Sequence, residues 1–485
     1  MSMGNKRSVP FNFAMNFIMK LLGPVCSAIS YPYAFRAIGQ TEMGRVAFTI
    51  SVVSLFLLIA NLGIPTYGVR ECAKVRDEKD KLSKLCRELI AIQFLATFAS
   101  VLLLAFSVIA VSQLRGEWRL FMIQGAILLF QGLSTEWLFQ GLERYGFLTL
   151  RSSLVKVASV LLIILLVKGP EDYLIYCVLT AGTAAASVVL NLPALKNAIG
   201  PRKKEEKLEL GRHIRPAFVF FAQAAAITIY TSFDSALLGF IKGDTAVGAY
   251  DAAVKIKLVL VYFITSLGTV LLPRFSYYIG EKRGKDFGRG VGLSASFMWL
   301  TALPLTAFFL ILGRDCLELL YGSVTDATRQ SLRILVLTLI PIGITNLVGV
   351  QVLTPIGREK TVMWAEVTGA IINLAADFVL ISLYGPMGAA IGTLISELAV
   401  LAVELAGIRG LKLKVFNGKE IFTVLGAVLA ASMILLGVKH VVSGLVAEVL
   451  LGLVVFFLAT YGILYGFKAP LLVWGKDKFW NYLKK

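Results

Sequence analysis

A few cationic side chains interrupt long apolar segments of this sequence, and their positions indicate an anion-binding chemistry. Asn16 and Lys20 lie four residues apart in the first segment, on a polar stripe that covers an arc of about 80° on a helix. Arg36 follows that segment, Lys156 lies in the fifth and Lys255 in the eighth. Ionisable groups inside a membrane helix usually face a cavity or a partner because they are costly there. These cations therefore predict a cleft that attracts a phosphate-bearing ligand.

Amide, aromatic and acidic side chains share helical faces in the second half of the sequence. Gln223, Tyr230 and Asp234 lie on one face of the seventh segment. We expect Gln223 and Tyr230 to line the cleft and Asp234 to bind a coupling ion or balance the cations. Asp251 precedes Lys255 by four residues, so the two can pair, with or without a further role.

A third polar face follows in the eleventh segment. Glu366, Asn373 and Asp377 lie at positions i, i+7 and i+11, close to one face of a helix. Such carboxylates take up protons or sodium ions for coupling, or they balance nearby cations. The small polar residues of these stripes have a second interpretation, which is the packing of one helix against another.

The composition indicates a membrane protein. The chain has 485 residues, of which 57% are hydrophobic and 16% charged, whereas about a quarter of the residues of a soluble protein are charged. The net charge of +18 does not form one basic domain, so a nucleic-acid partner is not expected. Instead, the basic residues lie in short links between apolar segments, which is typical of proteins oriented by positive loops.

The elements that must position these residues are transmembrane helices. The sequence predicts an all-α polytopic membrane protein of about fourteen transmembrane helices, because each apolar segment is long enough to span a bilayer. The segments are expected at 11–35, 46–66, 88–112, 118–140, 148–167, 173–194, 216–240, 246–272, 290–312, 330–353, 362–383, 387–407, 420–438 and 446–466. Basic residues concentrate in the even-numbered links and at both ends, so both termini are predicted to be cytoplasmic.

The chain also repeats itself. Residues 39–44 read GQTEMG between the first two segments, and residues 243–248 read GDTAVG between the seventh and eighth. Gly169-Pro170 is likewise echoed by Gly385-Pro386 six segments later. An even number of helices separates each pair, so we expect two six-helix lobes in a parallel, pseudo-two-fold arrangement, plus two C-terminal helices. The expected divisions are 1–207 for the first lobe, 208–413 for the second, and 414–485 for the last two helices and a cytoplasmic tail.

Cysteine and histidine give no metal or redox signature. Five cysteines lie in or beside apolar segments without CxxC spacing, so they are expected to be small buried hydrophobic residues. His213 and His440 have no partner at metal or triad spacing. No GxxxxGK[ST] motif is present, so the chain has no ATP motor of its own, and no cofactor is expected.

Several blocks of the sequence resemble the Wzx-type polysaccharide flippases of the multidrug/oligosaccharidyl-lipid/polysaccharide (MOP) exporter superfamily. The resemblance covers nearly the whole chain, and its blocks are residues 39–44, 62–74, Asp234, 248–250, 252–253, 255–256, Leu272-Pro273 and 385–393. It implies a flippase that turns undecaprenyl-diphosphate-linked oligosaccharide repeat units across the plasma membrane by alternating access, in O-antigen, capsule or exopolysaccharide synthesis. The implied partners are this substrate, membrane lipids, and polymerase and glycosyltransferases of the same pathway.

Three other functions remain open from the sequence. A drug/cation antiporter of the same superfamily would require carboxylates to dominate the cleft, but cations are at least as numerous here. A lipid II flippase is the second alternative. A repeat-unit polymerase is the alternative from another class, but it requires a sizeable outer loop, and the longest outer link, at 313–329, is short. A transporter rather than an enzyme is therefore expected.

Overall fold

The computed structural model describes residues 9–200, 207–411 and 417–467, and within these ranges the chain forms helices and no strand. Eleven of the described helices are long and apolar enough to span a membrane. The number becomes twelve if the bent pair Gly211–Ile229 and Ser232–Lys242 counts as one span. The all-helical membrane fold is therefore confirmed, while the exact number of fourteen spans stays a prediction.

Packing divides the chain into two units, Met1–Gly248 and Ala249–Lys485. The helices of the first unit are α1 (Val9–Ile38), α2 (Gln40–Asn61), α3 (Ile64–Val75), α4 (Lys79–Ala110), α5 (Ser112–Gly116), α6 (Trp118–Gly132), α7 (Glu136–Gly141), α8 (Tyr145–Leu166), η1 (Pro170–Asp172), α9 (Tyr173–Ala198) and α10 (Gly211–Lys242). Helix α11 (Asp244–Gly280) begins in this unit and continues into the second.

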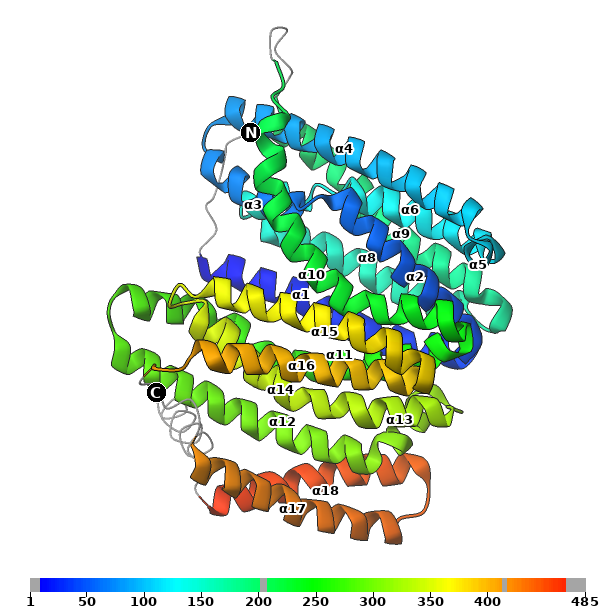
Figure 1. Cartoon of the computed structure of the whole chain (residues 1–485), viewed down its shortest axis with the longest axis vertical. Coiled ribbons are helices and arrows are strands. Elements are labelled where there is room, and N and C mark those ends of the chain that lie inside the picture. The colour runs from blue at the N-terminus through cyan, green and yellow to red at the C-terminus, as the bar shows by residue number, and fades with distance from the viewer. Residues whose placement is uncertain (1–8, 201–206, 412–416, 468–485) are drawn as a thin grey trace. The chain divides into compact units, whose positions relative to one another are not determined.

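The first unit is a bundle in which α6 packs against α2, α4 and α9, and α8 packs against α1 and α9 (Figure 1). Helix α10 packs against α2 and α3. The segment expected at 216–240 corresponds to α10, which the sequence assigned to the second lobe and packing assigns to the first unit. The lobes were defined by the internal repeat and not by packing, so their boundaries at 207 and 413 stay a prediction.

The second unit is built around the pair α15 and α16, which pack along their whole length (Figure 1). After α11, the described helices of this unit are, in chain order, α12 (Gly284–Tyr321), α13 (Asp326–Leu335), η2 (Val336–Thr338), α14 (Leu339–Thr345), η3 (Asn346–Leu353), α15 (Glu359–Tyr384), α16 (Pro386–Gly407), α17 (Gly418–Val441) and α18 (Leu445–Gly466). The segment expected as one helix at 330–353 lies within the uninterrupted helical span Asp326–Leu353, which changes helical type three times. Pro341, which has no N–H to donate, lies in the third of its four parts. The last piece, η3, is a π-helix.

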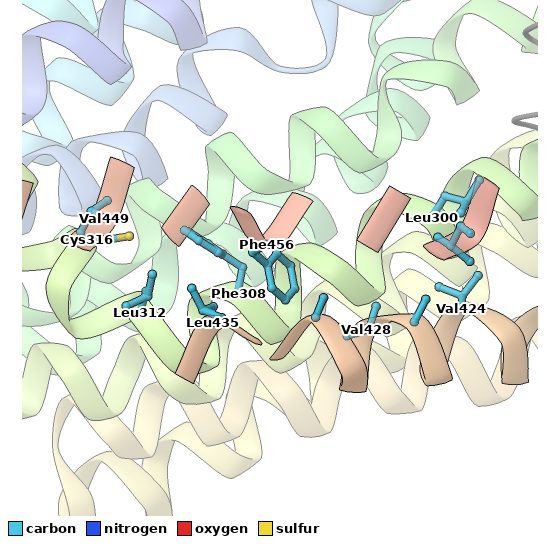
Figure 2. Close-up of a cluster of buried hydrophobic side chains, with 12 residues drawn as sticks. Leu300, Phe308, Leu312, Cys316, Val424, Val428, Leu435, Val449 and Phe456 are labelled. Atoms are coloured by element: carbon cyan, nitrogen blue, oxygen red, sulfur yellow. The ribbon is translucent and has the colours of Figure 1, made fainter. Parts of the chain in front are cut away.

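The two C-terminal helices pack on α12 through an apolar cluster. Phe308 and Leu312 of α12 meet Leu435 of α17 and Phe456 of α18 (Figure 2). All four side chains are almost completely buried, while the opposite faces of α17 and α18 expose large apolar residues such as Phe422 and Leu458. Those faces suit contact with lipid, because the helices have no polar stripe for water.

One expected helix is shorter than predicted. The segment at 118–140 was expected as one helix, but it is interrupted at residues 133–135 between α6 and α7. Gly132 packs so closely on Thr97 of α4 that a Cβ there would lie 2.5 Å from the threonine hydroxyl oxygen. This close approach comes directly before the interruption, and the periodicity of apolar residues does not report such a break.

The internal repeat is visible in the backbone. Gly39 before α2 has φ 93° and ψ 164°, and Gly243 before α11 has φ 80° and ψ −179°. Each N–H donates to the carbonyl four residues before it, and each carbonyl accepts from the N–H four residues after it. Both conformations lie in a region that favours glycine. The glycine at the start of each repeat motif therefore performs the same turn.

The two motifs also pack on each other in a symmetric way. A Cβ on Gly44 would lie 1.9 Å from the carbonyl oxygen of Asp244, and a Cβ on Gly248 would lie 2.0 Å from that of Gln40. The hydroxyls of Thr41 and Thr245, which are 204 residues apart, lie 3.0 Å from each other. Equivalent residues thus make reciprocal contacts, as residues do around a two-fold axis. We call this contact of residues 40–44 with 244–248 the glycine junction.

We predict that Gly44→Val and Gly248→Val each destabilise the protein by about 2 kcal/mol or more, because the added side chain would overlap a backbone carbonyl that cannot rotate away. Thermal unfolding of the purified protein in detergent measures this effect. Gly426→Ala is the matched control, since nothing lies within 4 Å of its Cβ position. Equal unfolding temperatures for Gly44→Val and the control would contradict the close packing.

Candidate functional site

Lys156 lies against the first helix. Helices α1 and α8 run parallel, since the Thr149 hydroxyl donates to the Met15 carbonyl at 2.7 Å and the Tyr33 hydroxyl donates to the Ile164 carbonyl at 2.9 Å. Between these contacts, a Cβ on Gly23 would lie 3.0 Å from Lys156 Nζ. The structure therefore brings Lys156 to the polar stripe of α1, at the position where that stripe has its smallest residue.

The other candidates of the first unit are more scattered. Asn16 is half-buried on α1, whereas Arg36 near the end of α1 and Gln223 on α10 are exposed. Asp234 is buried on α10. The side chains of Lys20 and Tyr230 lie outside the described residues, so their roles stay predictions.

Asp251 and Lys255 form the expected pair on α11. Lys255 Nζ lies 3.4 Å from Asp251 Oδ1, and the lysine is about one-third exposed while the aspartate is nearly buried. The Tyr321 hydroxyl donates to the Ala252 carbonyl at 3.2 Å and holds α11 against α12. The ammonium group is thus presented from a fixed helix, with part of its surface open to a ligand.

Asn373 and Asp377 lie on the face of α15 that packs against α16. A Cβ on Gly392 of α16 would lie 2.2 Å from Asp377 Oδ1 and 3.7 Å from Asn373 Nδ2. Both side chains are completely buried, and neither the oxygen nor the nitrogen of the Asn373 amide has a hydrogen-bond partner among the described residues. A buried amide of this kind is costly unless a ligand satisfies it. Glu366 lies on the same helix and is half-buried.

Helix α16 carries a polar face that is not among the predicted site residues. Thr393, Glu397 and Glu404 are buried, and the Thr393 hydroxyl lies 3.0 Å from that of Tyr250. The three residues lie at positions i, i+4 and i+11 of one helix, the same kind of spacing that identified the polar face of α15. This signal was available in the sequence.

Charged residues surround the glycine junction. Arg45 Nη1 lies 3.0 Å from Glu42 Oε2, and its Nε lies 3.5 Å from Glu117 Oε1 and 3.6 Å from Asp244 Oδ2. Glu117 lies between helices, and burial raises the pKa of its carboxyl above the ordinary value, while the guanidinium of Arg45 opposes that shift. One arginine thus balances three carboxylates around the junction.

A second charged network anchors the start of α10. Glu88 Oε2 lies 2.5 Å from Arg212 Nη2 and 2.9 Å from His213 Nε2, while His213 Nδ1 lies 2.8 Å from the Tyr67 hydroxyl. The N–H of Glu209 donates to Glu88 Oε1 at 2.8 Å. A hydrogen bond from Lys84 lowers the pKa of the exposed Glu209 carboxyl. The network joins α3, α4 and α10, and it serves structure because its buried groups satisfy one another.

A buried arginine in the same unit is also paired within the protein. Arg151 of α8 donates to Glu136 and to Asn191 Oδ1, the latter at 2.6 Å, and also to the carbonyl oxygen of Ser187 at 3.1 Å. Arg151 was not among the sequence candidates, and its neighbours explain it as a link between α7, α8 and α9. Lys156, one and a half turns further along α8, has no such set of acidic neighbours within salt-bridge distance in the described residues.

The described residues contain no group of three His, Cys, Asp or Glu side chains arranged to hold a metal ion. The cysteines are free thiols, and all except the half-buried Cys26 are buried. The burial expected for the cysteines therefore holds for four of the five. Among the described residues, the cations Lys156 and Lys255 and the polar face between α15 and α16 are candidates for contact with a ligand.

We predict that Glu88→Gln lowers the free energy of unfolding by about 2–3 kcal/mol, because the amide cannot accept all the hydrogen bonds that the buried carboxylate accepts. Glu78→Gln is the matched control, since Glu78 forms an exposed pair with Lys81 and should change stability by less than about 1 kcal/mol. Thermal unfolding in detergent measures both variants. If they unfold at the same temperature, the Glu88 network does not anchor α10.

Comparison with known proteins identifies relatives that match most of the chain. Two curated relatives are assigned as O-antigen transporters. The Shigella dysenteriae protein is 24% identical over 79% of this chain and 95% of its own length. The protein of Escherichia coli strain K12 is 24% identical over 85% of this chain and 99% of its own length. By name, both relatives are transporters and not enzymes.

A solved structure shares the fold over nearly the whole chain. The inward closed conformation of the lipid II flippase MurJ superposes with a TM-score of 0.73 over 94% of this chain and 99% of that one, at 18% identity. A family model described as MatE matches residues 220–379. A second model, described as Polysaccharide biosynthesis protein, matches residues 11–279, which is more than half of the sequence. The chain therefore belongs to the polysaccharide biosynthesis protein family, within the MOP superfamily of membrane transporters.

Proposed function

We propose that this protein is a flippase, which turns oligosaccharide repeat units linked to undecaprenyl diphosphate from the inner to the outer leaflet of the plasma membrane. The observation that carries this proposal is the match to two relatives assigned as O-antigen transporters over 95% and 99% of their lengths. The product would enter O-antigen, capsule or exopolysaccharide synthesis, where glycosyltransferases make the unit and a polymerase joins it.

The cationic candidates supply the chemistry for the head group of this substrate. A diphosphate carries negative charge that must leave water to cross the bilayer, and ammonium groups compensate that charge. Lys156 beside Gly23 and Lys255 beside Asp251 are the described cations that suit this role. Asn16, Arg36 and Gln223 are proposed to contact the sugars or phosphates, together with Lys20 and Tyr230.

The glycine junction is proposed as a gate of alternating access. The positive-inside pattern orients residues 39–44 and 243–248 toward the outside, with both termini in the cytoplasm. Symmetric contact between equivalent parts of two repeats is the kind of contact that rocking of one repeat against the other can break and remake. Opening of the junction would then release the substrate outward.

The polar face between α15 and α16 is proposed as the site of ion coupling. Asn373 offers an unsatisfied buried amide beside Asp377, and Thr393 adds a hydroxyl on the facing helix. Asp234, Asp251 and Glu366 are further candidates for coupling or charge balance. A cation bound beside Asn373 would give the oxygen of its amide the partner that it lacks, and would tie transport to an ion gradient.

A drug/cation antiporter is the second candidate function, because the MatE family model matches residues 220–379. Those residues include the carboxylates Asp251, Glu366 and Asp377, which would attract a cationic substrate. The two functions differ in one requirement. A flippase needs the cations Lys156 and Lys255, whereas a cation antiporter would work as well or better without them.

We predict that deleting the gene in its native host traps intact lipid-linked repeat units on the cytoplasmic face, and that the wild-type gene restores surface polysaccharide. The double variant Lys156→Ala, Lys255→Ala should restore at least about tenfold less, because it removes two charge-assisted contacts to the diphosphate. Lys360→Ala, an exposed residue near the start of α15, is the control for loss of a lysine. Export of unjoined units in the deletion strain would instead indicate a polymerase.

We predict that a disulfide across the glycine junction stops transport. Thr41→Cys with Thr245→Cys places two thiols where two hydroxyls lie 3.0 Å apart, so mild oxidation should join them. Export of polysaccharide should fall under oxidant and recover after reduction. Each single cysteine variant should be insensitive to oxidant. Full export by the cross-linked protein would contradict the gate.

A further inference from the structure

Helices α15 and α16 run antiparallel, and their register brings two glutamates together. The close contacts along the pair join Gly392 with Asp377, Gly369 with Val400, and Gly407 with Thr361. In this register Glu404, three residues before Gly407, lies opposite Glu366, and the two carboxyl groups interact electrostatically. This position is far along the helix pair from Gly392, so it is distinct from the site of Asn373 and Asp377.

Glu404 is held against a π-helix. The exposed fraction of Glu404 is only 2%. A Cβ on Gly349 of η3 would lie 2.2 Å from Glu404 Oε1, and the N–H of Gly349 donates to the carboxylate. The other oxygen, Oε2, is buried without a hydrogen-bond partner among the described residues. π-Helices are rare in proteins overall, but those that occur are often found at functional sites. Here the carboxylate of Glu404 packs against the backbone of the π-helix η3 at Gly349.

The groups facing Glu404 are acidic or neutral. On α15 the group that faces Glu404 is Glu366. On α16 itself, Glu397 is buried about two helical turns before Glu404 and on the same face. Helix α14 (LIPIGIT) and η3 (NLVGVQVL) contain no ionisable residue. On α13, Arg329 pairs with Glu318 at 2.7 Å and with Asp326 at 2.6 Å, and Arg333 is exposed. Arg358, which precedes α15, donates to the Gly407 carbonyl at 2.6 Å.

We infer that Glu404 and Glu366 form a proton-binding site, with Glu404 as the group that holds the proton. Acidic groups that repel one another in an apolar surrounding are costly to keep ionised together unless a cation or a proton compensates them. A proton fits better than a metal cation, because a sodium ion needs several oxygen ligands, while the N–H of Gly349 already occupies one carboxylate oxygen. The protonated Oε2 would donate to Glu366 and gain the partner that it lacks.

The role of this site in transport rests on the proposed function, but the presence of the proton does not. The site lies where α16 approaches its last turn, and the positive-inside pattern places that turn on the cytoplasmic side. A proton held there on α16 lies along the same helix pair as Asn373 and Asp377. The proton would be exchanged with the cytoplasm when α15 and α16 move apart at this end of the helix pair.

Infrared difference spectroscopy tests the site directly. The full-length protein in liposomes, in sodium-free buffer at neutral pH, should show a C=O stretching band of a buried carboxylic acid. This band should be lost in Glu404→Gln and retained in the control variant Glu448→Gln, because Glu448 pairs with Lys439 at 3.2 Å rather than with another acid. Glu366→Gln should keep the band at a changed frequency, because the acidic proton would face an amide.

Two results would overturn the inference. One is a band that persists in Glu404→Gln while thermal unfolding shows that the variant is folded. The other is a band frequency that does not change in Glu366→Gln. Glu404→Asp, which keeps the acid, should retain a band and guards against loss through misfolding. Polysaccharide export is measured in parallel, so that failure of the flippase proposal, with the band still assigned to Glu404, is distinguished from failure of the proton site.

Discussion

A charged or hydrogen-bonding group inside a bilayer persists only if another group or a ligand compensates it, and this constraint sorts the polar residues of the chain. Glu88, Arg151 and Lys439 are compensated by partners within the protein. They tie α10 to α3 and α4, α8 to α7 and α9, and the C-terminal helix pair to α12. Asn373 and Glu404 Oε2 are not compensated among the described residues. The first set explains how the bundle holds together, and the second contains the groups for which we propose a ligand or a proton.

The same constraint explains the importance of small residues. Without a hydrophobic driving force between helices in lipid, helices associate through close packing and hydrogen bonds. Gly44 and Gly248 allow two helix starts to touch through their backbones, and Gly23 makes room for Lys156. Gly392 and Gly349 do the same for Asp377 and Glu404. Glycine therefore appears both where repeats meet and where a polar side chain must enter a packed interface.

Much of the fold was predictable because membrane helices carry a strong signal in a single sequence. The apolar segments, the pair Asp251 and Lys255, and the repeat at residues 39–44 and 243–248 follow from length, spacing and local identity. The break between α6 and α7 and the π-helix were not predictable, since both depend on contacts between helices. Glu404 was missed for another reason. Its spacing from Thr393 and Glu397 indicates a shared polar face, but only the packing of Glu404 against Gly349 shows that the carboxylate is buried.

Reconstitution of the purified protein in liposomes tests the flippase proposal most directly. A fluorescent undecaprenyl-diphosphate-linked oligosaccharide is placed in both leaflets, and a glycosidase is added outside. The proposal predicts that the inner-leaflet pool becomes accessible to the enzyme in liposomes with protein, and that it stays protected in protein-free liposomes. Equal protection of the inner pool in both preparations, with the protein folded and inserted, would contradict a flippase.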